Sequence, residues 1–405
     1  MTKEERFTSN YRWALLALIA LSSMLTIAMP SSALSVLFDE IRQDIGLSIV
    51  QIGVIWSVSS FTGLLMALPG GLLSDRFGPR TMLTIIFIVG GFFSLLRGFT
   101  TSYIPFLLTS FVFGIFLATA GLNMIKVVTG WFSPAERGMA TGVFSAGFAG
   151  GFLIGSFSAA TYLSPWLGGW PNVFFLFGGL SILIGIAWFV LYPKLSEEET
   201  LARQALTLRE STIDPLKQVL LKPNLWIIAV AKLGFLGCVR GFSGYLPLYL
   251  RGQGWLPTQA DYTISLFYLF SLIFVIPLSI YSDRVGRRRP FLVVLTAVLG
   301  LAVLGVPLTG GWVLILCVIL AGLTFDAVMG LSVAAVTEVK GVGAALASTA
   351  VGLTFMIQQL GGTLAPIIGN SLESYSPQAP FYFWGGMALA GSLLIAFMSE
   401  EKRLG

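Results

Sequence analysis

The chain has 405 residues, of which 56% are hydrophobic and 11% are charged, and it carries a net charge of +5 with no histidine. Soluble domains contain roughly 25% charged residues, so this composition excludes a cytosolic enzyme, a nucleic-acid-binding protein and a disordered scaffold. Without histidine, imidazole-based catalysis and metal binding are also excluded, and we expect no enzymatic activity, metal or cofactor. The composition indicates an integral membrane protein.

Twelve segments are apolar over about the 20 residues that a helix needs to cross a bilayer. In chain order they cover residues 12–37, 49–72, 81–99, 103–131, 138–163, 171–192, 224–250, 260–281, 290–308, 311–335, 343–371 and 379–398. Runs of this length leave backbone groups unpaired in a bilayer unless they are helical. The sequence therefore predicts an all-α integral membrane protein with twelve transmembrane helices.

Basic residues are distributed unevenly over the segments between these spans. If both termini are cytoplasmic, eighteen Lys and Arg residues fall on the cytoplasmic side, and only Arg42, Arg97 and Arg251 fall on the other. Lys and Arg accumulate in the cytoplasmic loops of membrane proteins. We therefore expect a multi-pass protein of the plasma or inner membrane with both termini in the cytoplasm.

The longest polar stretch, residues 194–222, separates the sixth span from the seventh. It is interpreted as a cytoplasmic linker that includes a short surface helix. It divides the chain into an amino-terminal six-helix bundle, residues 1–193, and a carboxy-terminal six-helix bundle, residues 223–405.

A short motif follows the second span and recurs after the eighth. The first copy contains Gly71, Asp75, Arg76, Gly78 and Arg80, and the second contains Asp283, Arg284, Gly286 and Arg288. Together with twelve spans and a long middle loop, the repeated motif resembles the Major Facilitator Superfamily of secondary transporters. Pro79 replaces a commonly basic position of the family pattern, and Ser279 replaces the leading glycine of the second copy.

The resemblance implies two pseudo-symmetric six-helix bundles, a monomer, and transport by alternating access around a midplane site. It also implies that Asp75 docks near the cytoplasmic N-terminus of span eleven and Asp283 near that of span five. The positive end of each helix dipole would attract the carboxylate and latch the cytoplasmic side shut. The alternative is that the motif is only a charge cluster that sets the orientation.

Four charged residues lie inside predicted spans and away from the span ends: Lys126, Lys232, Arg240 and Asp326. Each costs on the order of 2.5–3.5 kcal/mol at a helix centre, so such residues face a bundle interior or an aqueous cavity. They fall on spans four, seven and ten, and the resemblance implies that spans one, four, seven and ten line the central cavity. We therefore expect these four side chains at the functional site.

Arg240 is the strongest candidate for a substrate-binding residue, because its planar guanidinium suits a carboxylate or a phosphate. Asp326 is the candidate proton carrier, because burial raises the pKa of a carboxyl group and a nearby cation lowers it. The alternative is a permanent ion pair of Asp326 with Arg240 or Lys232. Lys232 and Lys126 either join the binding site or extend toward the membrane surface.

Uncharged polar side chains complete the list of candidate substrate-binding residues. They are Asn123 on span four and Gln358 and Gln359 on span eleven. Gln358 and Gln359 differ by 100° around a helix, so we expect one of them to face inward. The alternative role for each is a hydrogen bond between helices.

Three buried cations against one buried carboxylate favour an anionic substrate. Span seven, from Arg240 through the segment Gly244–Arg251, resembles that of organic-anion permeases, although span one here lacks the second arginine of organophosphate permeases. Nitrate porters carry arginines on spans two and eight, and both helix interiors lack one here. The sequence therefore predicts a proton-coupled secondary transporter of a small, carboxylate-like organic anion.

Two alternatives remain. The first is a drug/proton antiporter, because Gly142, Gly151 and Gly155 match part of the glycine pattern of that group, although Ser156 replaces its proline. The second is a non-transporting membrane sensor, which would usually add a soluble domain.

Overall fold

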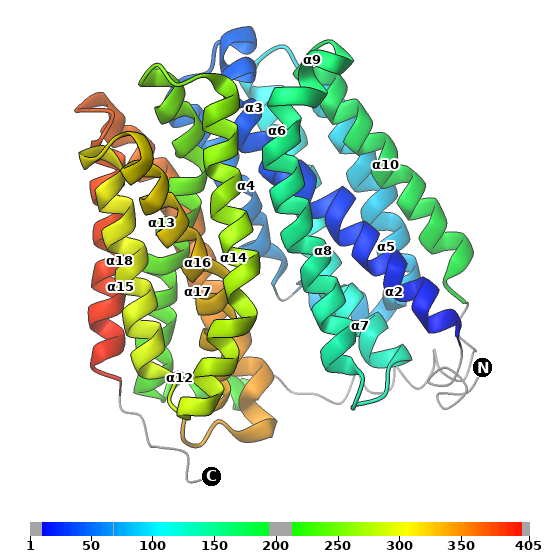
Figure 1. The fold of residues 1–405 in the computed structure, drawn as a ribbon. Helices are drawn as coiled ribbons and strands as arrows, with labels where there is room; N and C mark the ends of the chain where they lie inside the picture. The colour runs from blue at the N-terminus through cyan, green and yellow to red at the C-terminus, as the bar shows by residue number, and fades with distance from the viewer. Residues whose placement is uncertain (1–9, 68, 194–212, 399–405) are drawn as a thin grey trace. The chain divides into compact units, whose positions relative to one another are not determined.

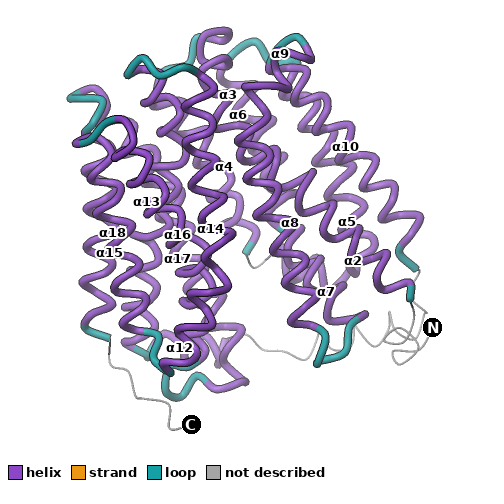
Figure 2. Tube along the Cα trace, viewed as in Figure 1, coloured by secondary structure: helices purple, strands orange, loops and turns teal. Residues whose placement is uncertain are grey.

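The computed structural model describes residues 10–67, 69–193 and 213–398. All regular structure in these ranges is helical, and none of it is strand (Figure 2). Twelve of the helical segments described there are long and apolar enough to cross a membrane. The prediction of an all-α membrane protein with twelve spans is confirmed.

The first six spans run from α2 to α10 (Figure 1). They comprise α2 (Tyr11–Ser22) continuing through a π-helical turn (Ser23–Ala28) into α3 (Met29–Ile45), α4 (Ile49–Met66), α5 (Pro69–Gly98), α6 (Tyr103–Ala118) with α7 (Ala120–Trp131), α8 (Arg137–Ser158) continuing through a second π-helical turn (Ala159–Leu163) into α9 (Ser164–Leu167), and α10 (Trp170–Leu191).

The short helix α12 (Ile213–Leu220) precedes the other six spans, and it falls in the predicted linker. The rest of the linker, residues 194–212, lies outside the described residues. The spans that follow are α13 (Pro223–Gly252), α14 (Pro257–Val285), α15 (Arg289–Gly305), α16 (Gly311–Thr337), α17 (Gly343–Ser371) and α18 (Ala379–Ala396).

The sequence suggested that the repeated motif is a loop, but in the structure most of its first copy is helical. The second span is also shorter than predicted. α4 ends at Met66, and α5 begins at Pro69, so most of the first copy is helical. The helix breaks at Gly78, whose φ of 75° and ψ of 161° place it outside the helical region. Glycine adopts a positive φ without steric cost, and the Pro79 that follows lacks the N–H that a continuous helix would use.

Residue contacts divide the chain into two compact units. The first contains residues 1–47 and 65–210, and the second contains residues 48–64 and 211–405. Most of α4 therefore packs with the helices of the second unit, although it precedes the linker in sequence. Asn370 on α17, for example, donates a hydrogen bond from Nδ2 to the carbonyl of Ile49, with a length of 2.9 Å.

The first unit has a core in which aromatic side chains fill the space between helices. Trp131 and Trp188 are almost completely buried there, together with Phe87. The indole Nε1 of Trp188 donates to the hydroxyl of Ser22 at 2.9 Å, so this core also ties α10 to α2. A buried Trp usually finds such a partner for its N–H.

α13 lies at the centre of the second unit. In its most apolar 18-residue window 72% of the residues are buried, against 33% for α14. The helix packs closely on α18, because Gly241 leaves no room for a Cβ beside the ring of Trp384. Trp384 is in turn fixed by a 2.8 Å hydrogen bond from Nε1 to the carbonyl of Ala365 on α17. α13 therefore offers a rigid support for the polar residues that it carries.

Candidate functional site

Arg240 lies in the middle of α13 and is half-buried. Its guanidinium carbon is 5.6 Å from the ring centroid of Trp56 on α4. The indole Nε1 of Trp56 also donates a 2.7 Å hydrogen bond to the Arg240 carbonyl. Gly244, one turn further along α13, permits this approach, because a Cβ there would lie 2.6 Å from the indole. Trp56 therefore fixes both the backbone and the side-chain direction of Arg240.

The Arg240 guanidinium has no acidic partner among the residues that the structure describes. The groups that lie near it are the Trp56 ring and the side chain of Tyr268 on α14. A partly accessible cation without a counter-ion is expensive in a low-dielectric setting. No acidic group of the described chain therefore neutralises the charge of this guanidinium.

Asp326 lies in the middle of α16 and is held by one residue of α14. The Ser271 hydroxyl donates to Asp326 Oδ2 at 2.7 Å, and the Asp326 backbone N–H donates to the same hydroxyl at 3.0 Å. Within the described ranges Asp326 forms no ion pair with either Arg240 or Lys232. The permanent ion pair considered as an alternative is absent from this structure.

Tyr268 connects the two charged groups. It lies near both Arg240 and Asp326, and its hydroxyl hydrogen-bonds with the side chain of Ser243 on α13. The side chain is 6% exposed, and its ring packs against Phe267 at 5.2 Å. Arg240, Tyr268 and Asp326 therefore form one polar cluster across α13, α14 and α16, which we call the α13 cluster.

The other predicted residues of the second unit are also buried. Lys232 is 5% exposed, and its ammonium makes no hydrogen bond or ion pair with any described residue. Gln359 donates from Nε2 to the carbonyl of Ser60 on α4 at 3.4 Å. Gln358 is 1% exposed, and its Oε1 has no hydrogen-bond partner among the described residues.

The two predicted candidates of the first unit already have protein partners. Lys126 forms an ion pair with Asp75 on α5, and both side chains are partly exposed. Asn123 is completely buried, accepts from the Ser74 hydroxyl at 2.8 Å and donates to the carbonyl of Thr119 at 2.9 Å. The structure thus places these residues at the contact between α7 and α5.

In the first copy of the repeated motif the basic residues reach different partners. Besides the Asp75–Lys126 pair, Arg80 donates to the Phe189 carbonyl at 2.5 Å and lies 4.7 Å from the centroid of the Phe189 ring. Arg76 lies 5.4 Å from the ring centroid of Phe77. Gly71 lies in the first helical turns of α5, and Gly78 is the residue at which that helix breaks.

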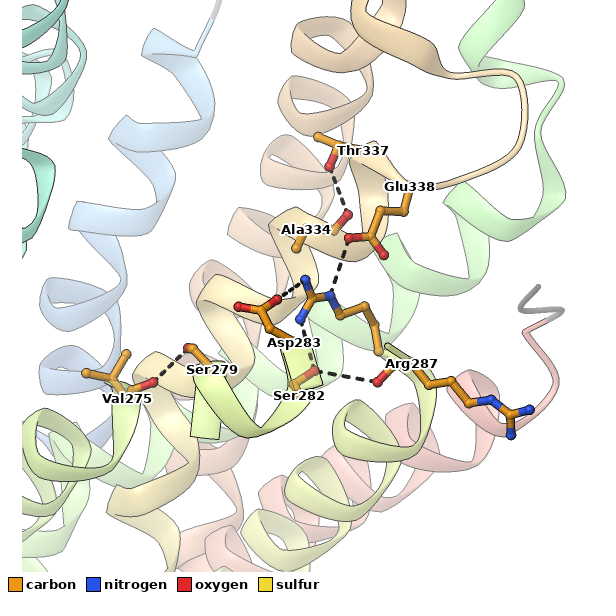
Figure 3. A network of polar contacts seen from close by, with 9 residues as sticks. Val275, Ser279, Ser282, Asp283, Arg287, Ala334, Thr337 and Glu338 are labelled. Atoms are coloured by element: carbon orange, nitrogen blue, oxygen red, sulfur yellow. Dashed lines mark hydrogen bonds and ion pairs between the residues drawn. The ribbon is translucent and has the colours of Figure 1, made fainter. Parts of the chain in front are cut away.

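In the second copy of the motif, Arg288 is the centre of the network of polar contacts shown in Figure 3. Arg288 forms ion pairs with Asp283 and, at 3.3 Å, with Glu338 at the end of α16, and it donates to the Ser282 hydroxyl at 3.1 Å. Burial lowers the pKa of Arg288, but its partners Asp283 and Glu338 more than offset this and raise the pKa above its ordinary value. Gly286 closes α14 with a φ of 67°, and Arg284 is exposed.

Both aspartates of the motif therefore have a partner inside their own unit. Their docking at span eleven and span five, which the family resemblance implies, remains a prediction.

Sequence reasoning missed Trp56, Tyr268 and Ser271, three residues that shape the α13 cluster. Tyr and Ser are common in transmembrane helices, so nothing in their local sequence distinguishes them. Trp56 carried a usable signal, because tryptophan concentrates at membrane boundaries and this one lies in the middle of a span. Arg97 was assigned to the outer side, but the structure buries it in the last turn of α5 at 2% exposure.

The twelve long apolar helices define a multi-pass membrane protein. The family model of the Major Facilitator Superfamily matches residues 16–260 and 252–404. The chain belongs to the Major Facilitator Superfamily, whose members are transporters and not enzymes.

Curated relatives are similar over parts of the chain. A probable L-galactonate transporter of Escherichia coli is 31% identical over 58% of this chain and 52% of its own length. A probable nitrate/nitrite antiporter of Thermus thermophilus is 29% identical over 62% of this chain and 56% of its own length. A probable galactarate/D-glucarate transporter of Bacillus subtilis is 28% identical over 47% of this chain and 44% of its own length. The matched region spans about half the length of each of these relatives.

Solved structures share the fold over almost the whole chain. A bacterial homologue of the human lysosomal transporter Spinster superimposes with a TM-score of 0.78 at 16% identity, covering 96% of both chains. A D-xylose-proton symporter gives a TM-score of 0.75 at 16% identity, covering 97% of this chain and 99% of the other. Identities this low establish a common fold alone.

Proposed function

We propose that this protein is a secondary transporter of a small carboxylate-bearing organic anion, coupled to protons and working by alternating access. Arg240 binds the carboxylate, and Asp326 carries the proton. The observation that carries the proposal is Arg240, a partly exposed residue inside a span whose guanidinium has no acidic partner in the described chain.

The names of the relatives support an acidic substrate. Galactonate, galactarate and glucarate are sugar acids, and transporters of these compounds match this chain at 28–31% identity. A planar guanidinium can form two parallel hydrogen bonds to a carboxylate. Lys232 and Gln358 are the further residues of the second unit that we assign to the substrate, since each offers a buried polar group without a partner among the described residues.

Asp326 supports the proton-coupled form of the proposal. Its carboxylate is held by a neutral hydroxyl, and Tyr268 lies near both Asp326 and Arg240. An acid without a permanent cationic partner is free to change its charge during the transport cycle. Arrival of an anion at Arg240 would favour protonation of the nearby carboxyl group, because like charges disfavour each other.

Uptake into proteoliposomes tests the substrate class. Purified protein is assayed with galactonate, glucarate, nitrate and a hydrophobic cation, each with and without an inward proton gradient. We expect sugar acids to be accumulated and the gradient to stimulate their uptake. Transport of the cation alone would replace the proposal by the drug/proton antiporter, and transport of nitrate alone would restrict the substrate to inorganic anions.

The variant Asp326→Asn tests the coupling. Asparagine keeps the size and one acceptor oxygen but cannot carry a proton, so uptake driven by the proton gradient should fall to the level without a gradient. Exchange of labelled for unlabelled anion across the membrane needs no net proton movement and should persist. If the gradient still stimulates uptake in this variant, Asp326 is not the coupling residue.

The proposal includes the membrane orientation. Both termini lie in the cytoplasm of a plasma or inner membrane, as the distribution of Lys and Arg indicates. In a Cys317→Ala background, a membrane-impermeant maleimide applied to intact cells should label Gln253→Cys, in the turn after α13, and not Lys340→Cys. Both positions are exposed on the protein surface. The reverse labelling pattern would invert the orientation.

A further inference from the structure

A cavity of about 440 Å³ lies on the second unit where α15 begins and α18 ends. It is lined by Arg287, Arg289, Pro290, Val293, Val294 and Ala396. Two of these described lining residues are cationic, none is acidic, and the others are apolar. None of them belongs to the α13 cluster, so the cavity is separate from the proposed transport site.

The cavity wall is built by two helices that are fastened together at this end. The Ser392 hydroxyl on α18 donates to the carbonyl of Val293 on α15 at 2.8 Å. Arg289, the first residue of α15, donates from Nη2 to the carbonyl of Ala396, the last residue of α18. This hydrogen bond positions the Arg289 guanidinium at the cavity and occupies a carbonyl whose negative end would otherwise face an incoming anion.

Arg287 presents its charge differently from its neighbour Arg288. Arg288 forms ion pairs with Asp283 and Glu338, whereas the Arg287 side chain extends away from this network (Figure 3). Its guanidinium makes no hydrogen bond or ion pair with the part of the chain that is described, and the residue is exposed. The backbone beneath it is anchored, because its carbonyl accepts from the Ser282 hydroxyl at 3.5 Å. A cation without a counter-ion among the described residues therefore lines the cavity.

The apolar lining belongs to helices that carry exposed apolar side chains near the cavity. Val294 is 57% exposed on α15, and Leu393 is 66% exposed on α18, and both helices are long and apolar enough to span the membrane. Exposed apolar side chains on such helices face hydrocarbon rather than water. The cavity thus joins a cationic end at the membrane boundary to an apolar side wall.

We propose that this cavity binds the phosphate of an anionic phospholipid, with Arg287 and Arg289 at the headgroup and Val293 and Val294 along the first part of an acyl chain. Basic pockets between transmembrane helices bind acidic headgroups in this manner. Free phosphate shares the headgroup chemistry but would leave the apolar wall unused. The proposal does not depend on the identity of the transported substrate.

Lipid titration of the purified full-length protein tests this site. Native mass spectrometry counts bound phosphatidylglycerol and phosphatidylcholine with identical acyl chains, for the wild type, Arg287→Gln and Arg284→Gln. Arg284 is the matched control, because it is an exposed arginine three residues away that does not line the cavity. The Arg287 side chain makes no described contact that folding would require, so its replacement should leave the fold intact.

We expect the wild type to prefer phosphatidylglycerol, and Arg287→Gln to lower that affinity about fivefold, the effect of one basic residue near an anionic headgroup. Arg284→Gln should change it less than twofold. Equal losses in the two variants, or equal binding of both lipids, would reduce the effect to general surface charge and overturn the proposal. Displacement of phosphatidylglycerol by inorganic phosphate at equal concentration would assign the site to free phosphate instead.

Discussion

Two arginines inside the spans, one in each unit, differ in what surrounds them. Arg97 in the first unit is 2% exposed and lies between the rings of Phe113 and Phe174, with guanidinium-to-centroid distances of 4.1 and 4.5 Å. Its Nη2 donates to the Ser94 hydroxyl at 3.0 Å. Arg240 in the second unit is half-buried and has one aromatic ring, at 5.6 Å.

The comparison separates a structural cation from one that is available to a ligand. Neither guanidinium has an acidic partner in the described chain. Arg97, however, is enclosed by aromatic faces that attract a cation, and its surroundings leave no room for a substrate. Arg240 is a partly exposed residue. The absence of a counter-ion is therefore informative about binding only when it is combined with access.

The largest expected effect is on transport, from Arg240→Lys. Lysine keeps the positive charge but loses the planar pair of donors, so we expect anion uptake to fall about 100-fold, as for a lost charged hydrogen bond of up to about 3 kcal/mol. Initial uptake rates per folded molecule measure this. The control is Arg97→Lys, whose uptake per folded molecule should match the wild type. Equal losses of uptake in both variants would mean that Arg240 and Arg97 do not differ in their role in transport.

The next effect is on stability, from the same change at Arg97. A lysine cannot stack on two rings and leaves a buried ammonium, so we expect Arg97→Lys to lower the free energy of unfolding by about 2 kcal/mol. Arg97→Met removes the charge while it keeps an apolar chain, and it should cost less than Arg97→Lys. Thermal unfolding in detergent measures both. A methionine variant less stable than the lysine variant would show that the charge itself is needed.

The smallest effect concerns the aromatic ring over Arg240. Trp56→Phe keeps a ring but removes the indole N–H that donates to the Arg240 carbonyl. A neutral hydrogen bond contributes about 0.5–1.5 kcal/mol, so we expect KM for the anion to rise about threefold with little change in the maximal rate. Uptake measured over a range of substrate concentrations separates the two. An unchanged KM would mean that Trp56 does not position Arg240.

The twelve spans could be predicted because each depends on local composition, and the observed limits mostly lie within a few residues of the expected ones. The exceptions follow from geometry. The motif around Asp75 was expected to be a loop, yet α5 runs through it and breaks only at Gly78. A charged stretch at the end of a span does not reveal whether the backbone remains helical there.

The candidate site was only partly predictable. Arg240 and Asp326 were identifiable because a charge inside an apolar run is costly whatever surrounds it. Their partners were not, because the contact between Trp56 and Arg240 joins residues 184 positions apart and depends on which helix faces meet. The same limit applies to Lys126, whose ion pair with Asp75 joins α7 to α5.

The packing of α4 has a consequence for evolution and for engineering. The aromatic ring that orients Arg240 comes from the region before the linker, and the arginine itself comes from the region after it. Exchange of whole halves between homologous genes would separate these two residues. A functional chimera must therefore inherit Trp56 together with Arg240, so a crossover placed at the linker is a poor choice.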